Sequence, residues 1–351
     1  MGVSINEAIK LITIAPADAI IGLVGPPGFG KSAAPRIAAS QMGWSYVCRY
    51  LALMEAVEIN GLPHLVDQNG IPAGRWAPFA GLFPLESDQL DGTVLLCLDD
   101  LGQASPSVTK AGVRVAYGDG IERMVGMHRL YPNTRIVFTS NLHTHRAGAH
   151  RFESYVGNRV TVVEVEPSAS EWVTWAIGAG VNASVISYVA WSKQITDFAP
   201  EKDAFMSPRS LEKLGRFISA LSDAGINGSV LRAVTYGTIG EQAGSQFLAY
   251  HALADKLPDM DAVLRGDRVK LPEQPEVQYM FVTSFIQAAQ EKHVPIAAKL
   301  ISQLTDAGAT GFEVAAFLTF EALKGSGERL RGIRTQPELY KWLSEYGRYL
   351  P

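Results

Sequence analysis

The stretch that decides the fold is Gly25-Pro26-Pro27-Gly28-Phe29-Gly30-Lys31-Ser32. Its spacing is Gly-x-x-x-x-Gly-Lys-Ser, and it lies between an apolar run at 19–24 and an Ala-rich, helix-like stretch at 32–42. Small residues let backbone N–H groups wrap phosphate oxygens, and the helix that follows points the positive end of its dipole at the anion. Lys31 is expected to neutralise the β- and γ-phosphates, and the Ser32 hydroxyl to contact Mg²⁺. The sequence therefore predicts a loop that binds a nucleoside triphosphate.

The composition is that of an ordinary globular protein. The 351 residues allow about two domains, and 47% hydrophobic with 19% charged residues can build a sizeable core. A formal net charge of −4 argues against a general polyanion binder, because such binding depends largely on neutralising phosphates; a local basic patch or pore is still compatible with it. No apolar run approaches the ~18 residues of a membrane span, and the chain begins with no signal-peptide pattern. We therefore expect a cytoplasmic protein without a membrane segment.

Alternating strand-like and helix-like segments predict a parallel sheet covered on both faces. The predicted strands follow a helix at 5–14 and lie at 19–24, 44–51, 94–98, 135–139 and 160–165. Two Gly-punctuated stretches, at about 59–84 and 118–130, are expected to form inserted hairpins or loops. Cys48 and Cys97 fall in the second and third predicted strands, and we expect reduced thiols in the core.

After Pro167 the pattern changes to helical periodicity, and no run predicts a convincing strand. Helical segments are expected at 170–192, 208–223, 228–236, 240–255, 276–293, 295–307, 310–324 and 336–348. The charged, Pro-containing stretch at 265–275 is the best candidate for a break among them. We therefore predict an α/β core at 1–167, a helical domain at 168–265 and a helical C-terminal extension at 266–351.

Two further predicted strands end in polar side chains suited to the same ligand. One ends in Asp99 and Asp100, and the next is followed by Asn141. Asp99 is expected to reach the Mg²⁺ held by Ser32, directly or through water, and Asp100 to orient the attacking water. Asn141 is suited to hydrogen-bond the γ-phosphate or that water, although an Asn after a strand is often a turn residue.

Taken in order, these motifs resemble those of the AAA+ ATPases, with Gly157-Asn158-Arg159 and Ser207-Pro208-Arg209-Ser210 following Asn141. The resemblance covers about residues 5–260 and is closest to the MoxR-like branch. More narrowly, it points to phage and bacterial members that tend to be paired with a von Willebrand A (VWA)-type protein. Five segments carry this narrower likeness: 59–63, 101–108, 145–151, 171–176 and 240–248.

The resemblance implies ATP and Mg²⁺ as cofactors and a site shared between the subunits of a homohexameric ring. Arg159 would be the arginine finger that reaches the γ-phosphate in a neighbouring subunit, and Arg151 and Arg146 are rivals for this role. Arg209, at the start of a helix of the lid (residues 168–265), would be the second sensor. In other NTPases a guanidinium acting in trans raises the rate by roughly 10³–10⁵. The two inserted hairpins match the helix-2 and pre-sensor-1 insertions of the MoxR-like clade, which usually face the central pore.

This chain departs from the AAA+ pattern at one position. The family generally carries Asp-Glu after the strand, whereas this chain has Asp99-Asp100. The shorter Asp side chain would place its carboxylate about 1 Å further from the attacking water, and a misplacement of that size can cost about 100-fold in rate. ATP binding is expected, and hydrolysis is expected to be slow.

Two further groups of residues have simpler explanations than a ligand site. His143, His145 and His150 have no cysteine or carboxylate at ligand spacing, so a polar loop is favoured over a zinc site. Arg123 and Arg129 of the second hairpin are compatible with a substrate contact in a pore and equally with a solvated hairpin.

The favoured interpretation is an AAA+ ring ATPase that remodels a protein partner, with a VWA-domain protein as the candidate. One alternative is a nucleic-acid motor or loader of phage replication or packaging, which the acidic charge and the lack of a Lys/Arg-rich stretch disfavour. A second alternative is a slowly hydrolysing scaffold that assembles when ATP binds.

Overall fold

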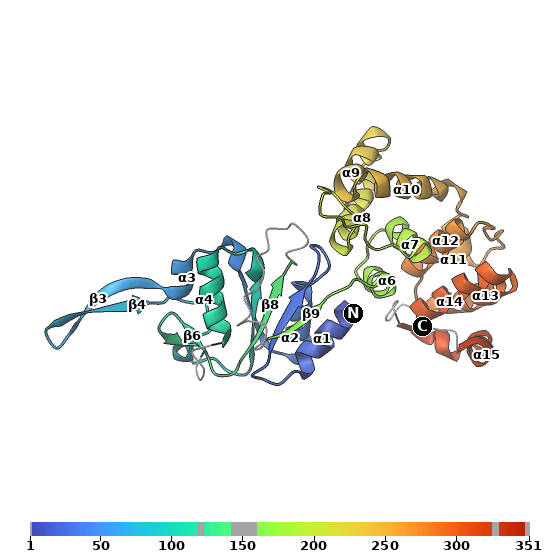
Figure 1. The fold of residues 1–351 in the computed structure, drawn as a ribbon. Helices are drawn as coiled ribbons and strands as arrows, with labels where there is room; N and C mark the ends of the chain where they lie inside the picture. Colours follow the sequence, from blue (N-terminus) through green and yellow to red (C-terminus); the bar gives the residue numbers. More distant parts are fainter. Residues whose placement is uncertain (1, 118–122, 142–159, 325–329, 348–351) are drawn as a thin grey trace. The chain divides into compact units, whose positions relative to one another are not determined.

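The computed structural model describes residues 2–117, 123–141, 160–324 and 330–347 (Figure 1). The chain divides into two compact units, each described by itself below. The first comprises Met1–Pro167 with Ala199–Glu201, and the second Ser168–Phe198 with Lys202–Pro351. Within the described ranges, no helix has both the length and the apolar character needed to span a membrane.

The first unit is built on a five-stranded sheet with the order β2-β5-β8-β1-β9, in which all neighbouring strands are parallel. Its strands are β1 (Ile20–Val24), β2 (Ser45–Tyr50), β5 (Val94–Asp99), β8 (Thr134–Ser140) and β9 (Thr161–Glu164). Each of the five strands predicted from the sequence is present, with ends within one residue of those expected. β1 and β5 are buried along their whole length, as strands of a sheet covered on both faces should be.

Helices cover both faces of this sheet. The helices are α1 (Ile5–Ile14), α2 (Ala33–Met42), α3 (Ala56–Asn60) and α4 (Pro106–Tyr117). On one face, Leu95 of β5 belongs to an apolar cluster with α1 and α2; on the other, the adjacent Leu96 joins a cluster with α3 and α4. This alternation follows from the two-residue period of a strand. The predicted fold class, an α/β P-loop NTPase core with a parallel sheet followed by a helical part, is confirmed.

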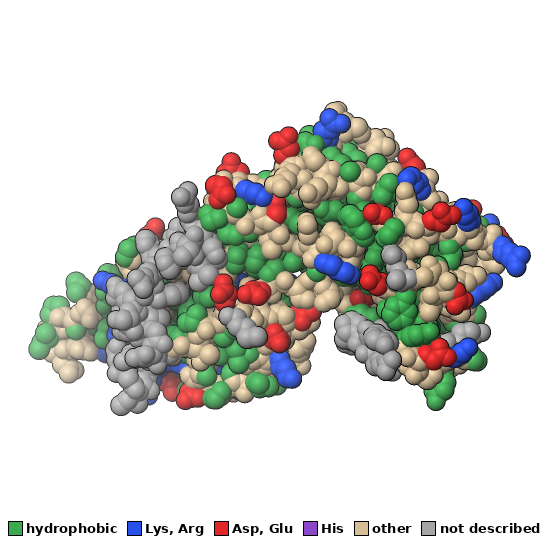
Figure 2. All heavy atoms as spheres, turned by 45° about the vertical axis from the view of Figure 1, so that its right-hand side comes forward, with side chains coloured by type: hydrophobic (Ala, Val, Ile, Leu, Met, Phe, Trp, Pro, Cys, Tyr) green, Lys and Arg blue, Asp and Glu red, His purple; other side chains and the backbone are tan. Residues whose placement is uncertain are grey.

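Both predicted insertions contain hairpins. The strands are β3 (Leu62–Gln68) with β4 (Ile71–Ala77), and β6 (Met124–Val125) with β7 (His128–Arg129). The β3–β4 ribbon extends from the sheet (Figure 1) and turns at Asn69 and Gly70, whose φ angles of 57° and 81° suit a tight hairpin turn. Its side chains Leu65 and Ile71 are 80% and 68% exposed, and Figure 2 shows hydrophobic side chains (green) at the left of the view, where this ribbon lies. Residues 118–122 of the second insertion lie outside the described residues.

The second unit is helical, and its described residues include no strand. Its helices are α6 (Ala169–Gly178), α7 (Ala183–Ser192), α8 (Pro208–Asp223), α9 (Ser229–Ile239), α10 (Glu241–His251), α11 (Met260–Arg265), α12 (Pro275–Ala288), α13 (Val294–Asp306), α14 (Ala309–Lys324) and α15 (Pro337–Tyr346). The segment expected at 170–192 forms two helices, because Gly180 turns the chain at φ 70° and the Asn182 side chain caps α7. The core of the unit contains fully buried aromatic side chains, including Phe247, Phe281 and Phe285.

Candidate nucleotide-binding site

The loop between β1 and α2 has the backbone expected of a phosphate-binding loop. Gly28 and Gly30 take φ angles of 82° and 85°, a region that side chains rarely adopt. A Cβ atom on Gly30 would also lie 2.9 Å from Cδ1 of Ile5, which would have to move, so the positive φ is the main reason for glycine there. The Gly30 carbonyl accepts hydrogen bonds from the N–H groups of Ala33 and Ala34, at 2.9 and 3.1 Å, which starts α2 directly after the loop. The N-terminus of this helix is thus placed where an anion would bind.

Lys31 lies at the centre of the loop, and its side chain is buried. Its Nζ atom donates to the carbonyl oxygens of Gly25, at 2.9 Å, and Pro26, at 2.7 Å. It also donates to Oδ1 of Asn141, at 2.9 Å, across 110 positions of sequence. The predicted Asn141 side chain is therefore brought to the lysine of the loop.

Ser32 and Asp99 also meet, as predicted for a pair that would hold Mg²⁺. The Ser32 side chain makes no cap on α2, and its hydroxyl donates instead to Oδ1 of Asp99, at 2.8 Å. The same carboxylate oxygen accepts a hydrogen bond from the Thr139 hydroxyl. Asp99 and Thr139 are almost completely buried, so this carboxylate is held by hydrogen bonds from both sides.

Thr139 also fixes the next residue, Asp100. The N–H group of Asp100 donates to Oγ1 of Thr139, at 3.1 Å, so one hydroxyl joins the two carboxylate residues. Asp100 has φ 55° and ψ 38°, a left-handed conformation that Asp tolerates better than most residues. Gln103 follows on a short 3₁₀ helix: its Nε2 donates to Oδ1 of Asp100, at 3.3 Å, and its Oε1 accepts from the Ser140 hydroxyl, at 3.4 Å.

Thr139 and Gln103 are the members of this network that the motif analysis missed. Parallel pairing of β5 with β8 runs through Leu98 and Phe138, so the next residues, Asp99 and Thr139, come side by side. The available signal was a hydroxyl residue at the end of an apolar strand that neighbours the Asp-bearing strand. Gln103 gave no comparable signal, because only the turn after β5 brings it back toward Asp100.

The residues of the site fit a Mg²⁺–nucleotide. Mg²⁺ prefers hard oxygen ligands, and the Ser32 hydroxyl and Asp99 carboxylate oxygens lie within hydrogen-bond distance of each other. The glycine loop, the Lys31 ammonium and the start of α2 together suit polyphosphate oxygens. Among the described residues, no group of three or more His, Cys, Asp or Glu side chains forms another metal cluster.

Several predicted residues are not part of this network. Arg159 and its rivals Arg146 and Arg151 lie outside the described residues, as do the three histidines at 143, 145 and 150.

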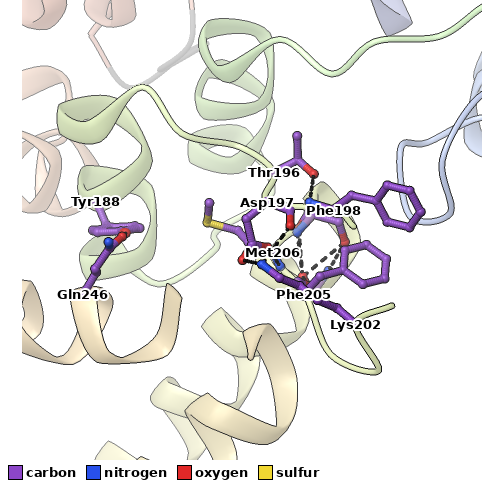
Figure 3. Close-up of polar contacts among 10 residues, drawn as sticks. Tyr188, Thr196, Asp197, Phe198, Lys202, Phe205, Met206 and Gln246 are labelled. Carbon is purple, nitrogen blue, oxygen red and sulfur yellow. Dashed lines mark hydrogen bonds and ion pairs between the residues drawn. The ribbon is translucent and has the colours of Figure 1, made fainter. Parts of the chain in front are cut away.

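Arg209 belongs to the helical unit, in the first turn of α8. The Ser207 side chain accepts from the Ser210 N–H and caps this helix. The loop before it is held by Asp197, which accepts hydrogen bonds from the Met206 N–H and, at 2.7 Å, from Lys202 (Figure 3). The start of α8, which carries Arg209, is therefore held by a helix cap and by the hydrogen bonds of Asp197.

Arg123 has a structural role within the first unit. Its guanidinium donates to the carbonyl oxygens of Thr134, at 2.7 Å, and Asp18, at 2.9 Å. Burial lowers the pKa of Arg123 from its ordinary value. These hydrogen bonds tie the second insertion to the sheet, and the contact of Arg123 with a substrate in a pore stays a prediction.

Comparisons with known proteins found similarity among solved structures. No protein-family model matches the chain, and no curated protein matches it. Among solved structures, the chain is similar to NtrX from Brucella abortus, crystallised in complex with ADP, at 16% sequence identity and a TM-score of 0.38. The alignment covers 99% of this chain and 69% of that one. The P-loop NTPase fold is assigned from the chain's own strand order, loop geometry and convergent motifs.

Proposed function

We propose that the protein is an AAA+ ATPase that binds ATP with Mg²⁺ and hydrolyses it to ADP and phosphate. One observation carries the proposal: three motifs far apart in the sequence meet at one edge of the sheet. Lys31 reaches Asn141 at 2.9 Å, and Ser32 reaches Asp99 at 2.8 Å. A Gly-rich loop that matched the motif by chance would not be expected to hydrogen-bond both Asn141 and Asp99.

In this proposal each residue has a separate task. The loop N–H groups and Lys31 hold the phosphates, and Asn141 positions Lys31 or the γ-phosphate. Ser32 and Asp99 would hold Mg²⁺, which would supply positive charge to the phosphates. Asp100 orients the attacking water, with its backbone fixed by Thr139. The carboxylate of Asp100 is shorter than the usual Glu, so slow turnover is expected.

The finer parts of the proposal rest on the sequence resemblance. We infer a MoxR-type homohexameric ring in which Arg159 of one subunit reaches the nucleotide of the next, while Arg209 acts as the second sensor. The expected partner is a protein, with a VWA-domain protein as the first candidate. The hydrogen-bonded state of Arg123 leaves the alternative, a nucleic-acid motor, with less support. The second alternative, a scaffold that assembles when ATP binds, differs from the proposed ATPase only in its slower rate of ATP hydrolysis.

The test measures mass by light scattering, with and without Mg-ATP, together with phosphate release in the same samples. We expect a nucleotide-dependent shift to about six subunits, the ring that the sequence resemblance implies, with hydrolysis that depends on assembly because the arginine finger acts in trans. Lys31→Ala should abolish binding and the mass shift, and Arg159→Ala should abolish hydrolysis alone. Lys10→Ala, which removes an exposed lysine of α1, is the matched control and should change neither.

The mass and phosphate-release measurements distinguish the ring ATPase from its two alternatives. A chain that binds ATP and assembles but releases little phosphate is the scaffold. Stimulation of the ATPase by single- or double-stranded DNA would favour the nucleic-acid motor. A monomer that hydrolyses ATP regardless of concentration and of Arg159 excludes the shared site. A chain that binds no nucleotide contradicts the whole proposal.

A further inference from the structure

The only two cysteines of the chain, Cys48 and Cys97, are neighbours in the sheet. Cys48 of β2 and Cys97 of β5 are direct register partners in parallel strands, so both side chains point to the same face. Cys97 is fully buried, whereas Cys48 is partly exposed and lies on β2, at the edge of the sheet. The Cys48 thiol is therefore reachable from solvent, and the buried Cys97 thiol lies beside it on the adjacent strand.

The geometry of neighbouring strands suits a bond between these two sulfurs. Adjacent strands lie about 4.8 Å apart, and the Cα atoms of disulfides are usually about 4.4–6.8 Å apart. The Cβ atoms of a disulfide approach to about 3.8 Å, which requires a local twist of one strand toward the other. β2 has a neighbour on one side only, so it can move without breaking a second strand pairing.

We propose that Cys48 and Cys97 form a redox modification site whose oxidation to a disulfide weakens nucleotide binding. The oxidant class is a peroxide. The Cys48 thiolate attacks one peroxide oxygen, the O–O bond breaks, and the leaving hydroxide takes up a proton as water. Cys48 is then a sulfenic acid. The Cys97 sulfur attacks the Cys48 sulfur, the S–O bond breaks, and the expelled hydroxide leaves as water with the Cys97 proton. In balance, two thiols are oxidised and one peroxide is reduced to two waters.

The surroundings of Cys48 support this order of events. The neighbouring Cys97 thiol lowers the pKa of Cys48 to about 7, with a further contribution from the Tyr46 hydroxyl, against the opposing effect of burial. A partly exposed thiol attacks a soluble oxidant more readily than a fully buried one. Cys48 is therefore the attacking residue and Cys97 the one that closes the bond.

The link to the nucleotide site runs along β5 and rests on the proposed function. Asp99 is two residues beyond Cys97, so the two side chains lie on the same face of the strand. Although β2 is the freer strand, the new bond also pulls on Cys97 of β5, and this pull shifts Asp99, whose Oδ1 accepts from Ser32 at 2.8 Å. Disturbing one hydrogen bond to a charged group should weaken Mg-nucleotide binding about tenfold.

The experiment treats the full chain with hydrogen peroxide and follows intact mass and peptide maps under non-reducing conditions. We expect the loss of two hydrogen atoms, a Cys48–Cys97 cross-linked peptide, and monomeric migration in a denaturing gel. Affinity for a fluorescent ADP analogue with Mg²⁺ should fall about tenfold on oxidation and recover with dithiothreitol. Cys48→Ala should keep its affinity after the same treatment, and Cys48→Ser serves if the alanine variant folds poorly.

Each of the other possible outcomes contradicts either the disulfide itself or its effect on nucleotide binding. Two free thiols after peroxide, or a Cys48 sulfinic acid without a cross-link, overturn the modification site. A cross-link with unchanged nucleotide affinity overturns the coupling to Asp99. If the reduced chain binds no nucleotide, the proposed function and the coupling both fail, while the mass measurement still decides whether the disulfide forms.

Discussion

The carboxyl edge of the sheet and the core of the helical unit differ in how completely their buried polar groups are hydrogen-bonded. At the sheet edge, Lys31, Asp99 and Thr139 are buried, and each is hydrogen-bonded to other residues of the site. In the helical unit, Oγ1 of Thr283 and Nδ1 of His251 are buried without a hydrogen-bond partner. Buried polar groups cost free energy unless they are paired, and the pairing at the sheet's carboxyl edge holds these side chains in one arrangement. The helical core is stabilised mainly by apolar packing.

The comparison predicts that a cavity in the helical core changes stability and leaves the nucleotide site intact. Phe281→Ala removes a fully buried ring from α12 and should cost about 3–5 kcal/mol. Hydrogen exchange should rise over α12 and its packing partners, with unchanged affinity of the folded chain for Mg-ADP. Phe217→Ala on α8 is the matched control, because that ring is 40% exposed; its cost should stay within about 0.5 kcal/mol. If Phe281→Ala instead weakened Mg-ADP binding while the helices stayed protected from hydrogen exchange, the proposed independence of the helical core and the nucleotide site would be contradicted.

The next largest effect should come from removing one hydroxyl at the sheet edge. Thr139→Val keeps the shape of the side chain, but leaves the Asp100 N–H without its acceptor and Asp99 without one donor. We expect a loss of about 1–3 kcal/mol in stability, accompanied by weaker Mg-nucleotide binding in a calorimetric titration.

Thr134→Val provides an internal control for that prediction. Thr134 lies on the same strand, and its buried hydroxyl has no partner. Replacing an unpaired buried hydroxyl by a methyl group should be neutral or stabilising, with no change in nucleotide affinity. Equal losses in the two variants would show that Thr139 contributes only packing.

A smaller effect is expected from Asp100→Glu, because the longer carboxylate favours hydrolysis while the left-handed backbone at this position disfavours Glu. Asp100→Glu lengthens the carboxylate and should raise the rate of phosphate release per bound ATP. The left-handed backbone at φ 55° disfavours Glu, so stability should fall by about 1 kcal/mol. Asp100→Asn suits the same backbone and should keep stability while losing hydrolysis. An unchanged or lower rate for Asp100→Glu would show that carboxylate reach does not limit turnover.

The sequence predicted the sheet edge well because each motif there is local and sits at the end of an apolar strand. The Lys31, Asp99 and Asn141 positions follow from three short stretches and from the rule that parallel strands share a carboxyl edge. Their hydrogen bonds confirm that these stretches meet. The left-handed conformation of Asp100 also gives a physical reason for Asp at a position where the AAA+ ATPases, which the sequence resembles, usually have Glu.

What the sequence did not predict depends on tertiary contacts. Thr139 has no motif of its own, and its role arises only from lying beside Asp99 in the sheet. From the sequence, Arg123 was a candidate for a pore contact, and its hydrogen bonds to two backbone carbonyls were not predicted. The two cysteines read as separate core thiols, and the pairing of β2 with β5 makes them partners. In each case the missing information is which strand or loop lies alongside.

The smallest effect should be a pH dependence confined to the helical unit. Burial lowers the pKa of His251, with the nearby Asp255 opposing it, and the ring stacks on Phe247 at 5.6 Å. The unfolded chain binds a proton at this residue below its ordinary pKa of about 6.5, where the folded chain still resists protonation. Because the unfolded state then binds more protons, the free energy of unfolding falls as pH decreases below about 6.5 and is unaffected above it.

His251→Phe keeps the stacked ring and removes the titration. The stability of the variant relative to the original chain should therefore rise steadily from about pH 7 to about pH 5, measured by denaturant unfolding. His293, whose pKa is also lowered by burial and by Lys292, is present in both proteins, so the difference isolates His251. Nucleotide affinity should not follow this pH dependence, because the ring belongs to the helical core. A difference that stays constant over the range would mean that His251 titrates equally in the folded and unfolded chains, and that the unpaired Nδ1 atom is as accessible to protons as it would be in water.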